Sequence, residues 1–297
     1  MSTFARATFD VARYLACRPT YPQAVYDTIL AHHRSNGGQF DRAVDLGCGP
    51  GFMALNLAPA FRHTTGIDPS SKMIDIGLQP TDPSVPRITY KVGGAETLSQ
   101  TVGPEGADLV VAGQAAHWFD YPKVWNELTK LVNAGGTVAF VGYAEALFTQ
   151  YPDLTPLITH HSASKDALGP YWSQPGRSIV ENLLDAVPFP LDHTSDFKPI
   201  PNPRLGEWDP ASALRIKTLH GERWLMTKTF SLSSLEGYFR TWSSLHSYLE
   251  KHPDSDIIET LMEKIQAGIP EGKKDEIELG WPLVLMMIKK KETHTSS

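Results

Sequence analysis

Three glycines at alternate positions follow a carboxylate in the sequence Val44-Asp45-Leu46-Gly47-Cys48-Gly49-Pro50-Gly51. The apolar residues before Gly47 predict a buried parallel strand, and residues 53–58 predict a helix. A strand, a glycine turn and a helix N-terminus form the nucleotide-binding corner of a doubly wound α/β sheet. A dinucleotide fingerprint would need a third glycine at Phe52, and a P-loop would need a Gly-Lys-Ser/Thr ending. Because Asp45 would repel a diphosphate and attract an ammonium group, the pattern favours a cofactor with a cationic end.

This combination resembles motif I of the class I S-adenosylmethionine (SAM) methyltransferases. Glycines at positions 47, 49 and 51 would let the backbone approach the methionine portion of SAM, and Asp45 would supply a counter-charge for its ammonium group. The alternative interpretation is a glycine-rich turn that binds no ligand.

The elements that must position this turn alternate between strands and helices in the first half of the chain. The predicted strands cover residues 42–47, 64–68, 87–92, 107–112 and 136–142, and the predicted helices cover residues 50–59, 70–78 and 121–131. Residues 133–136 (Asn-Ala-Gly-Gly) predict a turn before the fifth strand. The order predicts an α/β fold of the Rossmann-like methyltransferase class, with a seven-stranded, mostly parallel sheet and helices on both faces.

The pattern breaks after Gly142, where prolines and aromatic residues crowd the segment from 143 to 223. We interpret this segment as an insertion that forms a lid over the SAM-binding core, and residues 1–297 as a single domain; an interdomain linker is the alternative. Regular structure should return with a strand at 224–230, a helix with a Ser233/Glu236 capping box and a last strand at 281–288. The two late strands would form a closing hairpin of the main sheet.

Composition excludes several functional classes. The net charge is −6 and basic residues form no stripe, which argues against nucleic-acid binding. No apolar run is long enough to span a bilayer, and the first residues do not form a secretory signal. The two cysteines, Cys17 and Cys48, indicate a cytoplasmic protein without disulfides. The pairs His32-His33 and His160-His161 lack the spacing of metal ligands, so no metal is expected. The oligomeric state stays open.

Further residues are placed to hold the cofactor. Asp68 should follow the second strand, where an acid can bind the ribose diol, although it could instead cap the next helix. Arg18, with Tyr14 nearby, could pair with the methionine carboxylate, or could belong to a surface loop. The methyltransferase resemblance implies adenine contacts from Ala95 and Glu96. The predicted cofactor-binding residues are Tyr14, Arg18, Asp45, Gly47, Cys48, Gly49, Gly51, Asp68, Met73, Ala95, Glu96, Gln114 and Ala115.

Several blocks are more specific than the glycine turn. They are Arg18-Pro19-Thr20-Tyr21-Pro22, Ala116-His117-Trp118-Phe119-Asp120, the run from Leu168 to Arg177 (LGPYWSQPGR) and Arg240-Thr241-Trp242-Ser243. These blocks resemble the fungal trans-aconitate methyltransferase family. The resemblance covers nearly the whole chain and implies SAM-dependent methylation of a small-molecule carboxylate. Because relatives in that group also methylate thiols of sulfur-containing secondary metabolites, and residues 187–223 match poorly, thiol S-methylation is the alternative.

The two acceptors need different residues. A carboxylate needs cations, for which Arg177, Arg215, Lys217 and Arg223 are candidates, with Arg177 placed before a Ser178/Glu181 capping box. A thiol benefits from a base, which His117 or His246 could supply; His117 could equally orient its loop. Arg240 would face away from the apolar helix face. The predicted acceptor-binding residues are Trp118, Tyr143, Tyr171, Trp172, Arg177, Trp242 and His246. A SAM-binding protein without catalytic activity is the alternative from another functional class.

Overall fold

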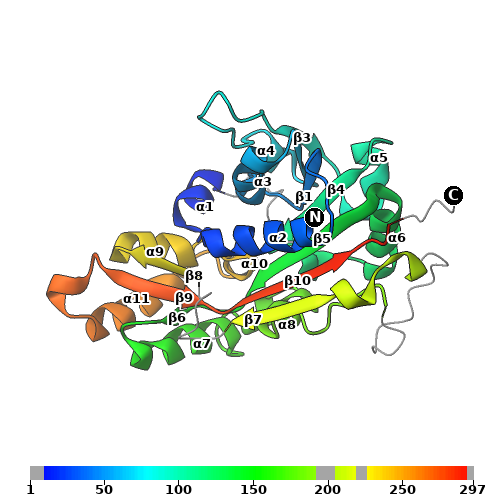
Figure 1. Cartoon of the computed structure of the whole chain (residues 1–297). Coiled ribbons are helices and arrows are strands. Elements are labelled where there is room, and N and C mark those ends of the chain that lie inside the picture. Colours follow the sequence, from blue (N-terminus) through cyan, green and yellow to red (C-terminus); the bar gives the residue numbers. More distant parts are fainter. Residues whose placement is uncertain (1–9, 192–204, 219–225, 293–297) are drawn as a thin grey trace, which may run out of the picture.

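The main sheet of the computed structural model has seven strands in the order β3-β2-β1-β4-β5-β10-β7, and the model describes residues 10–191, 205–218 and 226–292 (Figure 1). The strands are β1 (Arg42–Leu46), β2 (His63–Asp68), β3 (Thr89–Val92), β4 (Ala107–Gly113), β5 (Val132–Tyr143), β7 (Leu214–Thr218) and β10 (Leu283–Lys289). Strands β1 to β5 run parallel, and β10 pairs antiparallel with both β5 and β7. The predicted mostly parallel sheet is confirmed.

Helices cover both faces of this sheet because alternate strand residues are apolar on each side. On one face Val111 and Val141 pack with residues of α2 (Gln23–Ser35) and α3 (Phe52–Leu57). On the other face Val110 and Phe140 pack with α5 (Leu98–Val102) and α6 (Tyr121–Leu131). Helix α6 covers the residues predicted for it, 121–131, so this prediction is confirmed.

Two predictions in the first half are corrected. The helix expected over residues 70–78 is only α4 (Ser71–Ile74), because the chain turns so that Leu78 N–H donates to the carbonyl of Pro50 at 2.9 Å. The turn expected at 133–136 lies within β5, at an irregularity between the Ala107 and Leu109 positions of the β4–β5 pairing. Both glycines of this segment therefore lie within β5, and Gly135 has a φ of 76°.

The predicted closing hairpin is also wrong. Strand β8 (Met226–Phe230) pairs with β9 (Ile277–Trp281) in a second sheet of order β6-β9-β8, where β6 is Leu147–Phe148. The expected strand at 281–288 divides at Pro282, which separates β9 from β10. Strand β7, from the inserted segment, takes the edge position of the main sheet instead. Trp224 and Leu225 lie outside the described residues.

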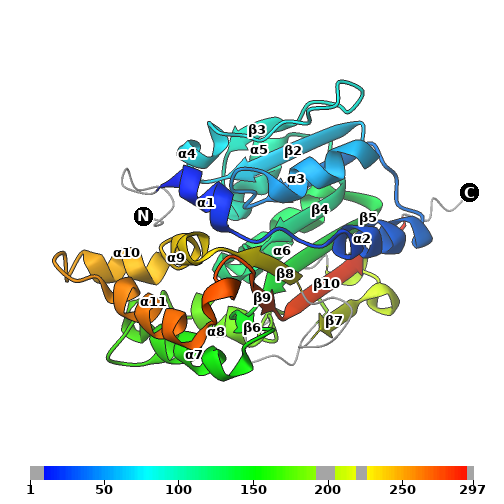
Figure 2. The same cartoon turned by 90° about the vertical axis from the view of Figure 1, so that its left-hand side faces the viewer.

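Most of the remaining helices gather at one end of the molecule, near the small sheet, whereas α8 lies below β7 in Figure 1 and packs on β5 (Figures 1 and 2). The remaining helices are α1 (Val11–Cys17), α7 (Thr155–Ala163), α8 (Gly176–Glu181), α9 (Leu232–Phe239), α10 (Ser243–Leu249) and α11 (Ile257–Gly268). The single helix expected from Ser233 is divided into α9 and α10. Its capping box is formed by Ser231 and Ser234, because the helix begins at Leu232, two residues earlier than expected, and Glu236 binds Arg240 at 2.7 Å instead. Arg240 also binds Asp256, away from the apolar face, as predicted.

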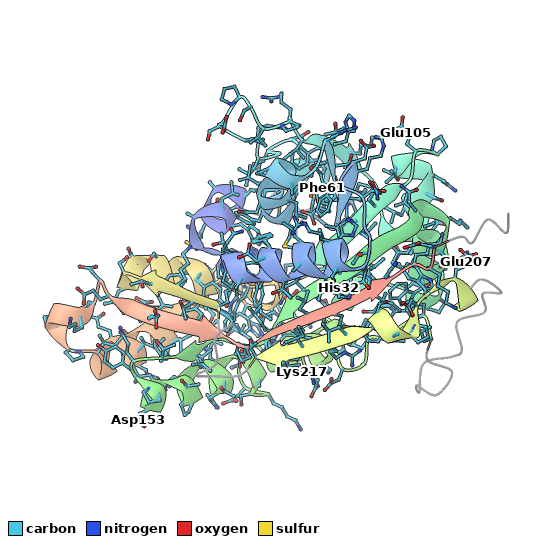
Figure 3. All side chains as sticks on the ribbon, in the orientation of Figure 1. His32, Phe61, Glu105, Asp153, Glu207 and Lys217 are labelled. Atoms are coloured by element: carbon cyan, nitrogen blue, oxygen red, sulfur yellow. The ribbon has the colours of Figure 1, made fainter. Side chains whose placement is uncertain are left out.

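Charged side chains such as Glu105 and Asp153 lie at the outside of the molecule (Figure 3). Among the described helices none combines the length and apolar character needed to cross a membrane.

Candidate active site

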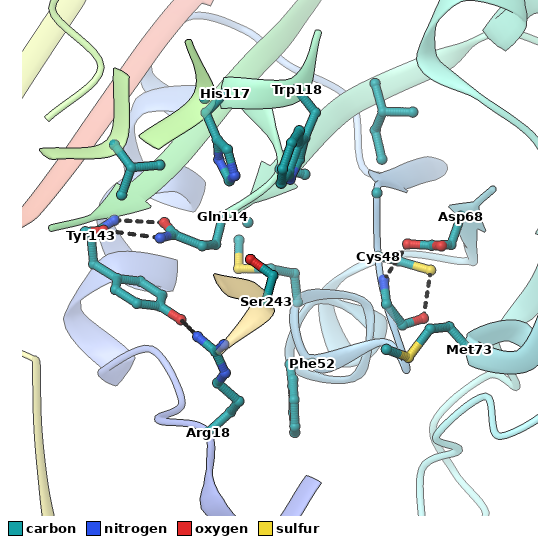
Figure 4. Close-up of a pocket in the computed structure, with 18 of the residues that line it drawn as sticks. Arg18, Cys48, Phe52, Asp68, Met73, Gln114, His117, Trp118, Tyr143 and Ser243 are labelled. Atoms are coloured by element: carbon teal, nitrogen blue, oxygen red, sulfur yellow. Dashed lines mark hydrogen bonds between the residues drawn. The ribbon is translucent and has the colours of Figure 1, made fainter. Parts of the chain in front are cut away.

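A cavity of about 650 Å³ opens at the carboxyl ends of β1, β2, β4 and β5, and residues of α8 and α10 form its opposite wall (Figure 4). Ligands bind at this edge of open α/β sheets. Every predicted cofactor-binding residue except Gly51 lines the cavity. His117 lines it too, together with Trp118, Tyr143, Trp172, Arg177 and Trp242 from the predicted acceptor-binding set. The structure therefore brings both predicted sets into one space.

The glycine turn leaves room for a ligand beside its backbone. Gly47 has a φ of 67°, and a Cβ there would collide with the Cβ of Ala115. Gly49 has a φ of 53°, but a Cβ there would meet no atom within 4 Å, since the position faces open space. Gly51 does not line the cavity, and its lack of a side chain instead accommodates the ring of Tyr90. The close backbone approach expected for a cofactor is thus available at Gly49, whereas the lack of a side chain at Gly47 accommodates Ala115.

Asp45 is a buried carboxylate with one unsatisfied oxygen. Its Oδ2 accepts a hydrogen bond from the Ala54 N–H at 2.9 Å, whereas its Oδ1 has no partner among the described residues. Burial raises the pKa of Asp45 to about 7. A buried acceptor without a partner is costly unless a ligand satisfies it. This part of the cavity therefore suits a cationic group, such as the ammonium of SAM.

Asp68 ends β2 on the other side of the turn. Its Oδ2 accepts from Gly49 N–H at 2.9 Å and its Oδ1 accepts from Ser70 N–H at 2.8 Å. Ser70, not Asp68, is the N-cap of α4, so the capping alternative is wrong. Each carboxylate oxygen keeps a second lone pair, with which it could accept from a ribose hydroxyl. Met73 lies beside Asp68 and Cys48 in this part of the cavity (Figure 4).

Arg18 lies in the wall of the same cavity and is held by several contacts. Its guanidinium donates to Tyr143 Oη at 3.4 Å and to the Thr241 carbonyl at 3.0 Å. It also lies over the rings of Tyr14 and Tyr238, at 5.2 and 5.7 Å from their centroids. These contacts orient the guanidinium within the cavity wall, and its buried Nε has no partner among the described residues. Arg18 is therefore placed to bind an anionic end of a ligand, and the surface-loop alternative does not describe its position.

Gln114 joins the ends of β4 and β5. Its side-chain amide donates to the Tyr143 carbonyl at 2.9 Å and accepts from the Tyr143 N–H at 2.8 Å (Figure 4). Its φ of 51° is in the left-handed region, which costs free energy in a residue with a side chain. The double hydrogen bond holds this backbone conformation at the cavity surface.

His117 and Trp118 project side by side into the cavity from the segment after β4 (Figure 4). Their ring centroids are 4.7 Å apart. The Nδ1 atom of His117 is buried and has no partner among the described residues. Burial lowers the pKa of His117 to about 3, so its imidazole is neutral at physiological pH. The neutral imidazole can accept a hydrogen bond, and its lowered pKa makes it a weaker base than a free imidazole.

Arg177 lines the cavity but is already bound by other side chains. Its Nη2 lies 2.8 Å from Glu145 Oε1 and its Nε lies 2.7 Å from Glu181 Oε1. The guanidinium also lies 4.3 Å from the centroid of the Trp172 ring. The predicted Ser178/Glu181 capping box is absent: the N-cap is Pro175, and Arg177 is inside α8. Arg177 thus ties α8 to the end of β5.

Other predicted acceptor-binding residues lie elsewhere. Tyr171 does not line the cavity; its hydroxyl hydrogen-bonds His252 Nε2 at 2.8 Å. His246 does not line it either, because α10 presents Ser243 and Ser247 to the cavity. Arg215 and Lys217 lie on β7 beside Asp185 and do not line the cavity, and Arg223 is outside the described residues. The described residues contain no group of three potential metal ligands.

Sequence reasoning missed several cavity residues. Tyr21 belongs to the Arg18–Pro22 block, so the block itself was the available signal. Glu145 follows directly after β5, at the carboxyl edge of the sheet, and topology could have indicated it. Tyr238, Ser243 and Ser247 come from α9 and α10, whose positions depend on tertiary packing.

Comparisons with known proteins agree with this geometry. Residues 44–140 match the model of a methyltransferase domain family. A probable S-adenosylmethionine-dependent methyltransferase of Saccharomyces cerevisiae is 26% identical over 271 residues, which cover 89% of this chain and 90% of the yeast protein. A putative methyltransferase of Dictyostelium discoideum is 25% identical and covers 93% of this chain and 92% of its own length.

The fold has a counterpart among solved structures. A putative type II methyltransferase from Anaeromyxobacter dehalogenans has a TM-score of 0.66 and 23% identity, and the match covers 93% of this chain and 99% of that chain. This structure shows that the fold is shared, whereas the domain match and the two full-length relatives indicate the activity and the cofactor. With its methyltransferase domain at residues 44–140, the chain is a SAM-dependent methyltransferase.

Proposed function

We propose that the methyl acceptor is a small molecule with a thiol or hydroxyl group, and that His117 receives the proton which this group loses. The observation that carries the proposal is that the His117 imidazole lines the cavity and is neutral before the reaction, so it can accept a hydrogen bond from the group that reacts. Trp118, Tyr143, Trp172 and Trp242 surround the acceptor part of the cavity with aromatic surface, which suits an apolar molecule.

We expect the predicted cofactor-binding residues to bind different chemical groups of SAM. Asp45 would bind the ammonium group, Arg18 the carboxylate, and Asp68 the ribose diol. SAM, when bound, supplies an activated methyl group on a sulfonium. The remaining task of the protein is to align the acceptor with that methyl group and exclude water. The inserted segment 143–223 contributes Trp172 and Arg177 to the cavity wall, which supports its proposed role as a lid.

The charges on the sulfonium and on the imidazole before and after methyl transfer explain why a neutral imidazole suits this reaction. The acceptor forms a bond to the methyl carbon while its own O–H or S–H bond breaks, and His117 takes the proton. SAM would supply the methyl group, and its sulfur would keep the electron pair of the methyl–sulfur bond and become neutral. The single positive charge therefore passes from the sulfonium to the imidazole, and the net charge of the cavity stays constant. Loss of the nearby sulfonium charge makes the imidazolium easier to form.

The positions of the arginines favour a thiol or hydroxyl acceptor over a carboxylate acceptor. The family resemblance implies carboxylate O-methylation, as in trans-aconitate methyltransferases, and a carboxylate acceptor needs a cation to bind it. Arg177 already pairs with Glu145 and Glu181. Arg18 is assigned to the cofactor carboxylate. An acceptor that enters neutral does not require a further cation, so we place thiol or hydroxyl methylation first and carboxylate methylation second.

The experiment compares wild type with His117→Gln on two phenols at pH 8. Phenol must lose its proton during the reaction, whereas 4-nitrophenol is already largely ionised. If His117 takes the proton, the variant should lose about 10²–10⁴-fold in kcat/KM for phenol and much less for 4-nitrophenol. Equal losses for both phenols would show that His117 only shapes the cavity. Binding of SAM without turnover of any acceptor would indicate the catalytically silent protein.

A further inference from the structure

A second hollow of about 410 Å³ lies against His117 and Trp118, between the segment 117–122 and the start of α8. We name it the outer groove and define it by residues 117–122, 174–176 and Ile179. It shares four lining residues with the main cavity, namely His117, Trp118, Phe119 and Gly176. The two spaces are therefore neighbours across one layer of side chains.

Gly176 allows α8 to pack closely on the His117 and Trp118 side chains, which form the partition between the main cavity and the outer groove. A Cβ at position 176 would lie 3.3 Å from His117 Cδ2 and 3.5 Å from Trp118 Cζ3. The lack of a side chain thus lets α8 approach both rings. The φ of Gly176 is not positive, so alanine can adopt this backbone conformation and the helix favours it. A methyl group here would act on the two rings and on the space between them rather than on the backbone.

Trp118 gives the groove an apolar surface that the protein itself does not cover. The residue is 50% exposed, which is unusual for a tryptophan. The polar groups of the groove are engaged elsewhere: Asp120 pairs with Lys123 at 2.7 Å, and Gln174 Oε1 accepts from Ser178 Oγ at 2.8 Å. The groove therefore offers an indole and no unpaired charge among its described lining residues, which suits a neutral aromatic group.

We propose that the outer groove is a second acceptor subsite, which binds a neutral aromatic extension of the molecule whose thiol or hydroxyl group lies at His117. The acceptor would extend past the Trp118 indole, which lines both spaces, with its reacting atom in the main cavity and its extension stacked on the indole. Gly176 then determines specificity, because a methyl group there would press on the two rings that separate the main cavity from the outer groove. This inference rests on the proposed function for the position of the reacting group.

Equilibrium binding tests the subsite without requiring turnover. Titration calorimetry on the protein loaded with S-adenosylhomocysteine would compare thiophenol with biphenyl-4-thiol, which adds one ring. Wild type should bind the longer thiol about tenfold more tightly. Trp118→Ala and Gly176→Ala should each reduce this ratio to about two or less. Gly272→Ala is the matched control, because a Cβ there meets nothing within 4 Å, and it should keep the wild-type ratio.

The midpoint of thermal unfolding shows whether each variant is folded, and it should lie close to that of wild type. Equal binding of the two thiols by wild type, or a ratio that Trp118→Ala leaves unchanged, would overturn the outer subsite. In that case methylation of thiophenol, with its dependence on His117, would still support the proposed function. If the ratio falls in both variants while neither thiol is methylated, the subsite is supported and the proposed function fails.

Discussion

Asp45→Asn is the substitution whose effect follows most fully from the structure. In the ligand-free protein burial raises the pKa of Asp45 to about 7, and its Oδ1 has no partner among the described residues. An ammonium group would bind the ionised carboxylate, so binding of SAM below pH 7 must release a proton. The dissociation constant for SAM should therefore rise as the pH falls through 7, by about tenfold between pH 8 and pH 6.

The asparagine variant removes the charge while it keeps the local structure. Its side-chain oxygen can still accept the Ala54 N–H, which Asp45 Oδ2 accepts at 2.9 Å. At pH 8 we expect a loss of about 1.5–3 kcal/mol in SAM binding, since a hydrogen bond to a charged group is lost. The dependence of SAM affinity on pH should also disappear. The ligand-free variant should be more stable than wild type above pH 7, by up to about 4 kcal/mol, because the wild-type carboxyl is ionised there against its raised pKa.

Titration calorimetry in two buffers with different ionisation enthalpies measures both the affinity and the number of protons released. Wild type should release close to one proton at pH 6 and nearly none at pH 8. A wild-type affinity that stays constant from pH 6 to 8 would refute the reasoning. The same pH dependence in Asp45→Asn would also refute it, because another group would then be responsible.

Two further predictions concern stability. Arg177→Gln should destabilise the fold by about 3–5 kcal/mol, because the largely buried Glu145 carboxylate loses its cationic partner and keeps only the hydrogen bond from Ser162 Oγ. Adding Glu145→Gln should recover part of that loss, and denaturant unfolding of the two variants checks this. A purely acceptor-binding Arg177 would show no recovery. Burial lowers the pKa of His161 to about 4, so the unfolded chain takes up a proton below pH 6.5 before the folded protein does. His161→Gln should therefore reduce the loss of unfolding free energy between pH 6 and pH 5 by about 1 kcal/mol, and an unchanged slope would contradict the assignment.

Structural features that depend on neighbouring residues were predictable from the sequence. The strand, glycine turn and helix around Gly47 depend on neighbouring residues, and so does α6, whose apolar periodicity gives its bounds directly. Parallel topology then places Asp68, Gln114 and Tyr143 at one edge of the sheet, because each follows or ends a strand.

Contacts between distant segments were not predictable in the same way. Arg177 was expected to face an acceptor, but its partner Glu145 is 32 residues away and only the packing of α8 on β5 brings them together. His246 shared a predicted helix face with Trp242, yet the helix breaks between α9 and α10, so the two residues are not on one regular helix. The closing strands were assigned to one hairpin because periodicity does not report which strands pair.

The most direct test of the central claim identifies the methylated atom. The enzyme would be incubated with SAM and an equimolar mixture of thiophenol, phenol and benzoate, three probes that share one ring, and the products would be identified by mass spectrometry. We predict the thioether or the aryl ether as the product, formed in amounts that fall strongly in His117→Gln. Methyl benzoate as the main product, formed equally by wild type and by His117→Gln, would contradict the account.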